Sequence, residues 1–258
     1  MKKVQTVSEI QGIKLTSDLE SLEVHKIALQ EAYKASLYHT NKVLLGYTDM
    51  ESMTHIPIIN ILESDQKRKL ICVPRGSFKS SLGVIGYSIW RLMSDPNLRI
   101  LIDSELYTNS TKFLREIKMQ VQSSKFIEIF GDWRGDVWNE GEIILKHRTK
   151  HRKEASITCG GVGTTKVGQH YDIIIGDDMN SDSNSATDEG RRKVVNHYKY
   201  NLSILEQTGE YVLIGTRYSE TDLIGWVIEN EIDIKDFRER KDFITKGLIK
   251  KDGVYIYE

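Results

Sequence analysis

The sequence predicts an α/β protein: a mostly parallel central sheet flanked by helices, with a helical extension at the N-terminus. Two observations support this fold class. From Lys69 onward, short apolar segments alternate with segments in which apolar residues recur every three or four positions. Strands that alternate with helices form parallel sheets covered on both faces. Residues 17–45, in contrast, have helical periodicity alone and few helix breakers.

The helical extension begins at Ser17 or Asp18, either of which is a plausible N-cap for one or two amphipathic helices. A turn at residues 46–50 leads to another helix that runs through Leu62. Short apolar runs predict strands at 69–73, 99–104, 142–147, 155–161, 171–178 and 209–218. Helical patterns predict helices at 80–95, 109–124 and 188–205, the first ending before Pro96.

The composition of the 258-residue chain, with 39% hydrophobic and 28% charged residues, is typical of a soluble globular protein. No apolar run approaches the ~20 residues that span a bilayer, and the N-terminal lysines precede no apolar segment, so neither a membrane helix nor a secretory signal is expected. Cys72 and Cys159 lack metal-ligand spacing and are predicted to be reduced, buried thiols. At a net charge of −1, nucleic-acid binding would need a local basic surface.

The stretch VPRGSFKSS (73–81) resembles a phosphate-binding loop, because it follows an apolar strand and opens a helix. The residues that would bind a nucleotide there are Gly76, Ser77, Phe78, Lys79, Ser80 and Ser81. Lys79 would reach the phosphates and Ser80 would contact Mg²⁺. Phe78 stands where the usual pattern has glycine, and it is expected to pack beneath the loop with only its N–H facing the ligand. Taken alone, the loop is better explained as an ordinary strand-to-helix turn with a surface lysine.

The stretch YDIIIGDD (171–178) places two carboxylates at the end of an apolar strand. Adjacent carboxylates repel each other unless a cation lies between them. In a Walker B element, Asp177 would hold Mg²⁺ and Asp178 would orient or deprotonate the attacking water. An isolated Asp-Asp pair is also compatible with a solvated turn or a helix cap.

A third strand ends in Gly215-Thr216-Arg217. In a parallel sheet, ligands bind beyond the carboxyl ends of the strands, where Lys79, Asp177 and Thr216 would meet. Arg217 would suit a phosphate sensor because guanidinium stays charged and binds oxygens in pairs. The structural alternative is an ion pair of Arg217 with Glu220 or Asp222.

These blocks together resemble the N-terminal ATPase domain of a tailed-bacteriophage large terminase, a P-loop NTPase of the RecA-like ASCE class that pumps DNA into a procapsid. The resemblance runs from about Gly46 to Asp222, and the Asp-Asp strand followed by GTRY is its most specific part. It implies ATP and Mg²⁺ as ligands, with Lys79 and Asp178 catalytic. It also implies that Arg75 contacts the terminal phosphate, and that Thr216 with Arg217 couples hydrolysis to DNA movement.

The resemblance further implies double-stranded DNA, the procapsid portal, a small terminase subunit and a homo-oligomeric ring as partners, with no membrane. The location would be the cytoplasm of the infected host cell and, transiently, the procapsid, but not the mature virion. Relatives place a basic residue, which acts on the neighbouring subunit, in the loop before the Walker B strand. The candidates here are Lys166, His170, Arg191 and Arg192.

The expected division is a helical extension or lid at 1–66, an ATPase core at 67–235, and the start of a linker at 236–258. The residues after Asp222 are too few for the nuclease domain of large terminases, so no DNA cleavage is expected from this chain. Basic stretches at 146–156 and 191–200 would form either a solvated surface or contacts to DNA phosphates or another subunit. Two alternatives to a packaging motor stay open: a helicase-like ATPase, and a non-catalytic DNA- or protein-binding module with a decayed P-loop.

Overall fold

The computed structural model describes residues 7–231, 248–251 and 254–257. Within them, nine strands form one sheet in the order β3-β4-β5-β2-β6-β7-β1-β9-β8. The strands are β1 Arg68–Cys72, β2 Ile100–Ser104, β3 Arg134–Trp138, β4 Glu142–Leu145, β5 Ile157–Cys159, β6 Tyr171–Asp177, β7 Leu205–Gly215, β8 Leu248–Lys251 and β9 Val254–Tyr257. The run from β5 to β9 is parallel, whereas β3, β4 and β8 are antiparallel to their neighbours. The predicted fold class is confirmed.

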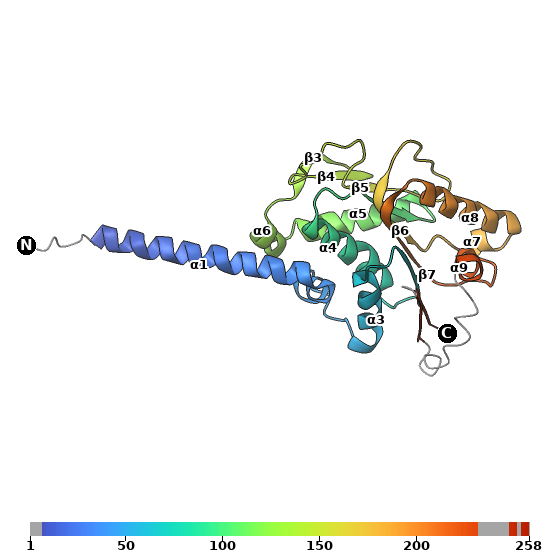
Figure 1. Cartoon of the computed structure of the whole chain (residues 1–258), viewed down its shortest axis with the longest axis horizontal. Helices are drawn as coiled ribbons and strands as arrows, with labels where there is room; N and C mark the ends of the chain where they lie inside the picture. The colour runs from blue at the N-terminus through green and yellow to red at the C-terminus, as the bar shows by residue number, and fades with distance from the viewer. Residues whose placement is uncertain (1–6, 232–247, 252–253, 258) are drawn as a thin grey trace, which may run out of the picture.

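Helices cover both faces of this sheet (Figure 1). They are α1 Val7–Ala35, α2 Leu37–His39, α3 Ser52–Glu63, α4 Tyr87–Ser94, α5 Tyr107–Val121, α6 Ser124–Phe130, α7 Asp182–Ser185, α8 Asp188–Ser203 and α9 Leu223–Glu231, with π-helical turns η1 Thr40–Leu44 and η2 Ser81–Gly86. The predicted helix at 80–95 is therefore η2 followed by α4, and the one at 188–205 is α8.

The alternation of side chains along β6 divides the core into two halves. Ile173 and Ile175 face a cluster built with α3, η2, α4 and α5, whereas Ile174 faces a cluster built with α8 and α9. These three isoleucines are 0% exposed, so β6 is buried on both of its faces. A strand buried on both faces needs a continuous apolar sequence, and this is why the run of isoleucines predicted a central strand correctly.

Glycine lets the helix that follows the VPRGSFKSS loop approach the sheet closely. A Cβ at Gly83 would lie 2.3 Å from Cδ1 of Ile214 in β7, and one at Gly86 would lie 1.8 Å from Oδ1 of Asn41 in η1. Real Cβ atoms do not tolerate either distance. Gly83 therefore sets how close η2 lies to β7 and Gly86 how close it lies to η1, and together they fix the position of the loop.

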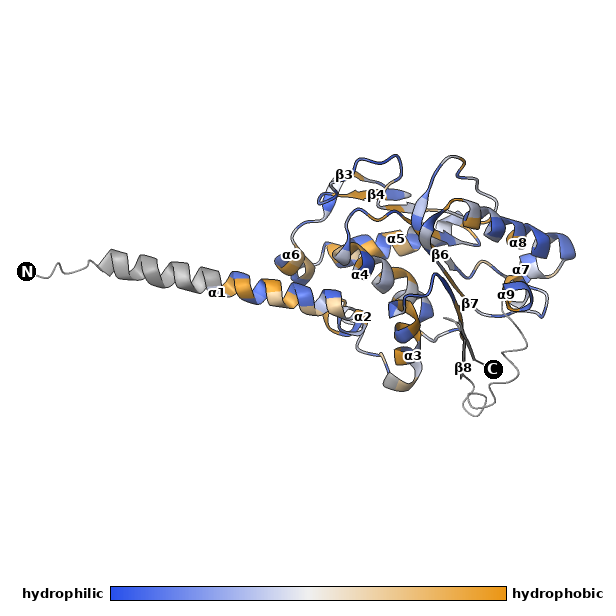
Figure 2. Cartoon of the chain, viewed as in Figure 1, coloured by the Kyte–Doolittle hydropathy of each residue, from blue (hydrophilic) through white to orange (hydrophobic). Residues whose placement is uncertain are grey.

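Helix α1 projects from the rest of the molecule (Figure 1). Only its C-terminal end is anchored in the part that the structure describes, where Tyr33 is buried and Trp90 Nε1 donates to the Lys34 carbonyl at 2.9 Å. Between residue 21 and the end of α1, several apolar residues are exposed (Figure 2), among them Leu22 and Ile27, which are 64% and 55% exposed. No helix in the described residues is both long enough and apolar enough to cross a membrane.

Several elements lay outside the expectations from sequence. β3 carries two charged residues and is half exposed, so it lacks the apolar run that marks a buried strand. Strand β9 pairs in parallel with β1, which places residues 254–257 in the sheet rather than in an extended connection. The proposed boundaries at 66 and 235 stay predictions. Both cysteines are buried and free, as expected.

Candidate nucleotide-binding site

The carboxyl ends of β6, β7 and β1 lie next to one another in the sheet. In register, Asp177 pairs with Ile214 and Cys72 pairs with Gly215. The loops that leave these three strands therefore begin at the same sheet edge. This juxtaposition, expected from the sequence, brings together residues that are far apart along the chain.

Left-handed backbone shapes the loop between β1 and η2. Gly76 has φ 79° and Phe78 has φ 61°. The second value is unusual for a residue with a side chain, and such a conformation costs about 1–2 kcal/mol. The Phe78 ring packs edge-on against Tyr47, with 5.3 Å between ring centroids, and against His55 at 6.0 Å. These contacts offset the strain. The ring thus packs against the apolar cluster, as expected; which way its N–H faces a ligand stays a prediction.

Ser80 and Asp177 are in direct contact at the centre of the site. The Ser80 hydroxyl lies 2.9 Å and 3.0 Å from the two carboxylate oxygens of Asp177. Burial and, to a smaller extent, the neighbouring Asp178 raise the pKa of Asp177 to about 7, against the opposing effects of Ser80 and Lys79. Ionising the buried Asp177 carboxyl group costs free energy, and a cation bound beside it would offset that cost.

Lys79 and Asp178 form the second pair. Lys79 Nζ lies 3.3 Å from Oδ2 of Asp178, and the lysine side chain is 7% exposed. Asp178 has φ 41°, and its N–H donates to the Ile214 carbonyl at 2.9 Å. Non-glycine residues with left-handed backbone are uncommon, and they often occur at functional sites. Here the conformation turns the Asp178 carboxylate towards the lysine.

Thr216 connects the second carboxylate to the third strand. Its N–H donates to Asp178 Oδ1 at 3.2 Å, and its hydroxyl donates to the Val73 carbonyl at 3.2 Å. Thr216 therefore contacts both the residue after β6 and the start of the VPRGSFKSS loop. A displacement of Asp178 or of the loop would therefore move the end of β7.

The two arginines near the site have different partners. Arg75 is exposed, donates to the Tyr218 hydroxyl and lies over its ring, with 5.4 Å from Cζ to the centroid. Arg217 Nε donates to the Ser219 carbonyl at 3.2 Å. Asp222 accepts instead from the N–H groups of Tyr218 and Ser219, so the ion pair considered as the structural alternative for Arg217 is not formed with it in this structure.

The four candidate trans-acting residues do not hydrogen-bond or ion-pair with Lys79, Ser80, Asp177 or Asp178 within the described chain. Lys166 is half-buried, and burial lowers its pKa. The His170 N–H donates to Glu154 at the amino end of β6. Arg191 is bound to Ser185 and Asp188, whereas Arg192 is exposed. Their roles stay predictions.

A buried polar cluster near the site was not foreseen. Asp103, at the end of β2, accepts from Asn201 Nδ2 at 2.6 Å and lies 2.6 Å from Nε2 of His197. The Gly163 N–H donates to Nδ1 of the same ring at 3.2 Å, so the proton of the neutral imidazole is on Nε2. The cluster fixes the loop before β6 on α8. The signal in the sequence was an aspartate ending an apolar strand, the same signal that identified Asp177.

The donor set suits Mg²⁺ bound together with phosphates. A hydroxyl and one or two carboxylates are what Mg²⁺ usually takes from a protein, the rest coming from phosphate oxygens and water. Ser80 and the buried Asp177 provide this set. In the described part of the chain, no cluster of three or more His, Cys, Asp or Glu side chains forms a metal cage of its own.

Comparisons with known proteins give structural neighbours only. No protein-family profile and no curated protein matches the sequence. The ATPase domain of the large terminase of Thermus phage P74-26 has a TM-score of 0.46 and 16% identity, over 69% of this chain and 68% of that one. The large terminase of bacteriophage HK97 has a TM-score of 0.54 and 10% identity.

The second comparison covers 87% of this chain and 43% of the HK97 protein, so the chain spans less than half of that protein's length. At this identity the likeness concerns the fold. The chain therefore shares its fold with part of a bacteriophage large terminase, the family that its sequence motifs resemble.

Proposed function

We propose that this chain is an ATP-hydrolysing motor domain of the large-terminase type, which drives double-stranded DNA into a procapsid. The observation that carries the proposal is the meeting of Lys79 with Asp178 and of Ser80 with Asp177 at the ends of neighbouring parallel strands. A solvated turn would leave these four groups apart. Their placement fits phosphoryl transfer, in which the protein positions the reactants and neutralises charge.

In this proposal, the backbone from Gly76 to Ser81 binds the phosphates at the start of η2, and Lys79 neutralises them. Ser80 and Asp177 hold Mg²⁺, which supplies positive charge to the phosphate oxygens when bound. Lys79 would then exchange its partner Asp178 for phosphate. Asp178, released from the lysine, would accept the proton of the attacking water.

The remaining roles follow from the contacts around Asp178. Thr216 donates to this carboxylate and would transmit its movement to β7, with Arg217 next in the chain. Arg75 lies at the exposed side of the loop and would turn from Tyr218 to the terminal phosphate. A basic residue of a neighbouring copy, with Lys166, His170, Arg191 and Arg192 as candidates, would complete the site in a ring.

The proposed partners are double-stranded DNA, the portal of the procapsid and a small terminase subunit. Residues 1–66 would act as extension or lid, 67–235 as ATPase core, and 236–258 as the start of a linker. The protein would work in the host cytoplasm and on the procapsid. We expect no nuclease activity: Mg²⁺ or Mn²⁺ and supercoiled plasmid should give no linear product on a gel.

Nucleotide binding and turnover test the proposal when they are measured separately. Wild type should bind a fluorescent ATP analogue in Mg²⁺. Lys79→Ala should lose this binding, while Asp178→Asn should retain it and lose turnover by about 10²–10⁴-fold. The exposed Lys112→Ala and Asp65→Asn are matched controls and should resemble wild type. Wild type that fails to bind, or turnover equal in all variants, would contradict the proposal.

A further inference from the structure

A groove of about 460 Å³ lies at the opposite edge of the sheet from the nucleotide-binding site. It is formed by the start of β3, the end of β4 and the loop that follows β4. Because β4 is antiparallel to β5, and β5 is parallel to β2, the end of β4 lies at the amino edge of the parallel strands. The motor chemistry proposed above uses the carboxyl edge and leaves this groove without a role.

The groove is strongly basic. The cationic or titratable side chains that line it are Arg134, Lys146, Arg148, Lys150, His151 and Arg152. Among its lining residues, all of which the structure describes, Asp136 is the only acidic one. Five lysines and arginines against one carboxylate leave a net charge that repels itself unless an anion is present.

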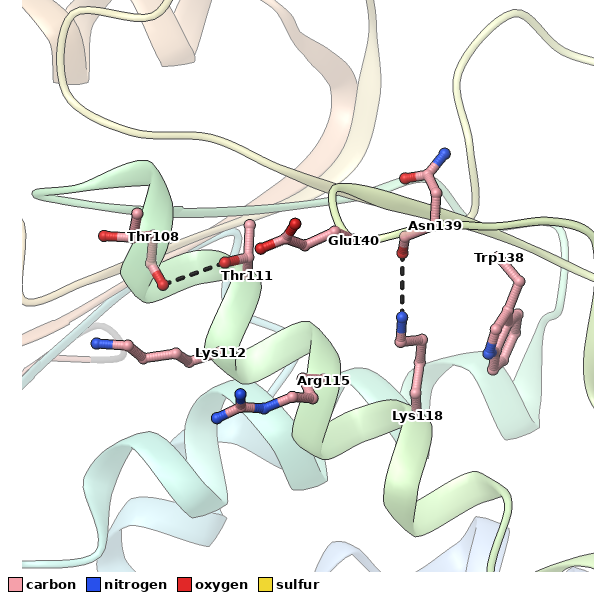
Figure 3. Close-up of a pocket in the computed structure, with 8 residues that line it drawn as sticks. All are labelled: Thr108, Thr111, Lys112, Arg115, Lys118, Trp138, Asn139 and Glu140. Carbon is pink, nitrogen blue, oxygen red and sulfur yellow. Dashed lines mark hydrogen bonds between the residues drawn. The ribbon is translucent and has the colours of Figure 1, made fainter.

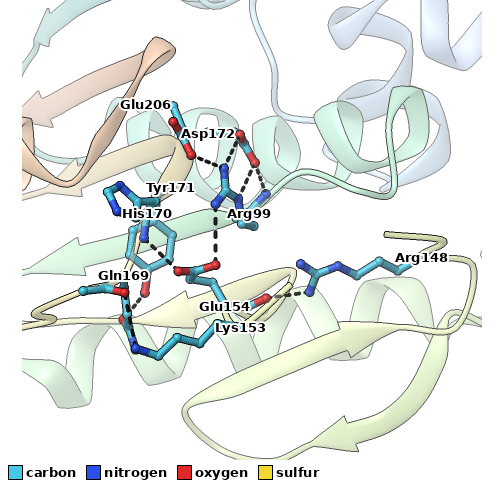
Figure 4. A network of polar contacts seen from close by, with 10 residues as sticks. Arg99, Arg148, Lys153, Glu154, Gln169, His170, Tyr171, Asp172 and Glu206 are labelled. Atoms are coloured by element: carbon cyan, nitrogen blue, oxygen red, sulfur yellow. Dashed lines mark hydrogen bonds and ion pairs between the residues drawn. The ribbon is translucent and has the colours of Figure 1, made fainter. Parts of the chain in front are cut away.

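The Arg148 side chain in this groove lacks hydrogen-bond partners for part of its guanidinium group. Its Nη1 donates to the Glu154 carbonyl at 2.6 Å (Figure 4), but its Nε and Nη2 are out of contact with solvent and have no partner among the described residues. Arg99 beside it is satisfied by Asp172, Glu206 and Glu154. Burial lowers the pKa of Arg148, and Arg152 and Arg99 lower it further. A buried guanidinium that lacks hydrogen-bond partners is costly, and an anion in the groove would offset this cost.

The basic loop is held in place before any ligand binds. Oδ1 of Asn97 accepts from the Thr149 N–H at 3.0 Å, from the Thr149 hydroxyl at 3.1 Å and from the Lys150 N–H at 2.8 Å. The Arg148 N–H donates to the Leu145 carbonyl at 3.1 Å. A fixed loop presents its cations with less loss of conformational entropy on binding.

A second basic pocket lies at the carboxyl edge of the sheet and serves as a comparison for the groove. It has a volume of about 380 Å³ and contains Lys112, Arg115 and Lys118 on α5 (Figure 3). Lys118 already donates to the Asn139 carbonyl at 3.1 Å, and the acidic Glu140 also lines this pocket, with its carboxylate directed towards Thr111 (Figure 3). It has three exposed or half-exposed lysines and arginines, against five in the groove, and none of its guanidinium nitrogens is both buried and without a partner, so it is a suitable control.

We propose that the groove at the amino edge binds the phosphodiester backbone of double-stranded DNA. A single phosphate would leave most of the groove's cations unneutralised, whereas a backbone supplies successive anions along the groove without base readout. The identity of the ligand as DNA rests on the proposed function. The groove itself rests on Arg148 and its neighbours.

The test compares two triple variants of the full chain. Arg134→Gln/Lys150→Gln/Arg152→Gln alters the groove, and Lys112→Gln/Arg115→Gln/Lys118→Gln removes the same charge from α5. Binding of a fluorescein-labelled 30-base-pair duplex is measured by anisotropy across a salt series. The groove variant should reduce the slope of log Kd against log salt by about 2–3, one unit per lost phosphate contact. The α5 variant should reduce it by less than one.

Equal slopes for the groove variant and wild type, or equal losses in both variants, would overturn the proposal. So would stronger competition by a polyglutamate peptide than by unlabelled duplex at matched charge. Inorganic phosphate that competes at micromolar concentration would also overturn it, because the ligand would then be a free anion. Mg²⁺-dependent ATP turnover without DNA should be unchanged in the groove variant. DNA binding without any turnover would refute the motor function and leave the groove intact.

Discussion

Phe78 occupies a backbone conformation that favours glycine, and its ring compensates by packing on Tyr47 and His55. Two opposing terms decide how this position responds to substitution. Removing the ring loses about 2–3 kcal/mol of packing, while removing Cβ relieves about 1 kcal/mol of strain. The packing term is the larger one, so the aromatic residue persists where a phosphate loop usually has glycine.

We therefore predict that Phe78→Gly and Phe78→Ala both lower thermal stability, with Gly the less damaging by about 1 kcal/mol. At an ordinary helical or extended position the order would be reversed, because glycine has the more flexible unfolded chain. Thermal denaturation followed by circular dichroism measures the difference. A lower melting temperature for Gly than for Ala would refute the strained conformation.

Some of the site residues could be identified from the sequence, whereas their contacts could not. Lys79, Asp177 and Thr216 were identified because each follows an apolar strand, and the carboxyl ends of parallel strands meet. The hydrogen bond between the Thr216 N–H and Asp178 was not predictable, since it depends on the left-handed turn at Asp178. The hydrogen bonds of Asp103 were likewise not predictable, because its partners His197 and Asn201 lie on a helix far along the chain.

At the scale of elements, η2 is placed by the absence of a side chain at Gly83. We predict that Gly83→Ala destabilises the protein by about 1–3 kcal/mol, because its Cβ would overlap Cδ1 of Ile214. Ile214→Val removes that atom and should by itself cost about 0.5–1.5 kcal/mol.

The double variant provides the control. If the clash is local, Gly83→Ala with Ile214→Val should be more stable than the sum of the single effects by at least 0.5 kcal/mol. Denaturant titration of the four proteins measures this coupling. Strict additivity would show that the helix does not rest on β7 in this way.

At the amino ends of the strands, Arg99 links β2 to β6, to β7 and to the segment that precedes β5. It donates to Asp172, Glu206 and Glu154 and is 4% exposed (Figure 4). Hydrogen bonds from the Arg99 side chain and N–H, together with its charge, hold the pKa of Asp172 below its usual range despite burial, and the pKa of Glu154 is also lowered.

A carboxyl group whose pKa falls on folding stabilises the native state above its unfolded pKa, near 4, and loses that contribution as pH falls through the lower folded value. We predict that Asp172→Asn loses about 1–3 kcal/mol of unfolding free energy at pH 7 and a smaller amount at pH 3, because the contribution declines as pH falls below about 4. Denaturant titration at both values checks this, with the exposed Glu189→Gln as control. An equal loss at pH 7 and pH 3 would contradict the ionic account.

At the scale of the whole molecule, the two edges of the sheet carry different chemistry. The carboxyl edge holds acids, a lysine and hydroxyls in mutual contact, and the amino edge holds unneutralised cations. Alternation of apolar and helical segments was sufficient to predict the parallel core between β5 and β1. It could not predict β3, whose exposed, charged residues show no strand period, or the pairing of β9 with β1, which depends on contacts distant in sequence.

In the proposed motor, Ser80 and Asp177 would hold one Mg²⁺ beside a nucleotide whose terminal phosphate faces Asp178. A crystal structure of the chain with Mg²⁺ and a non-hydrolysable ATP analogue tests this most directly. We expect the Ser80 hydroxyl to lie within about 2.0–2.1 Å of the ion and Asp177 to bind the ion directly or through water. Lys79 should have moved from Asp178 to a phosphate. An ion away from Ser80 and Asp177, or a Phe78 ring that fills the phosphate position, would contradict it.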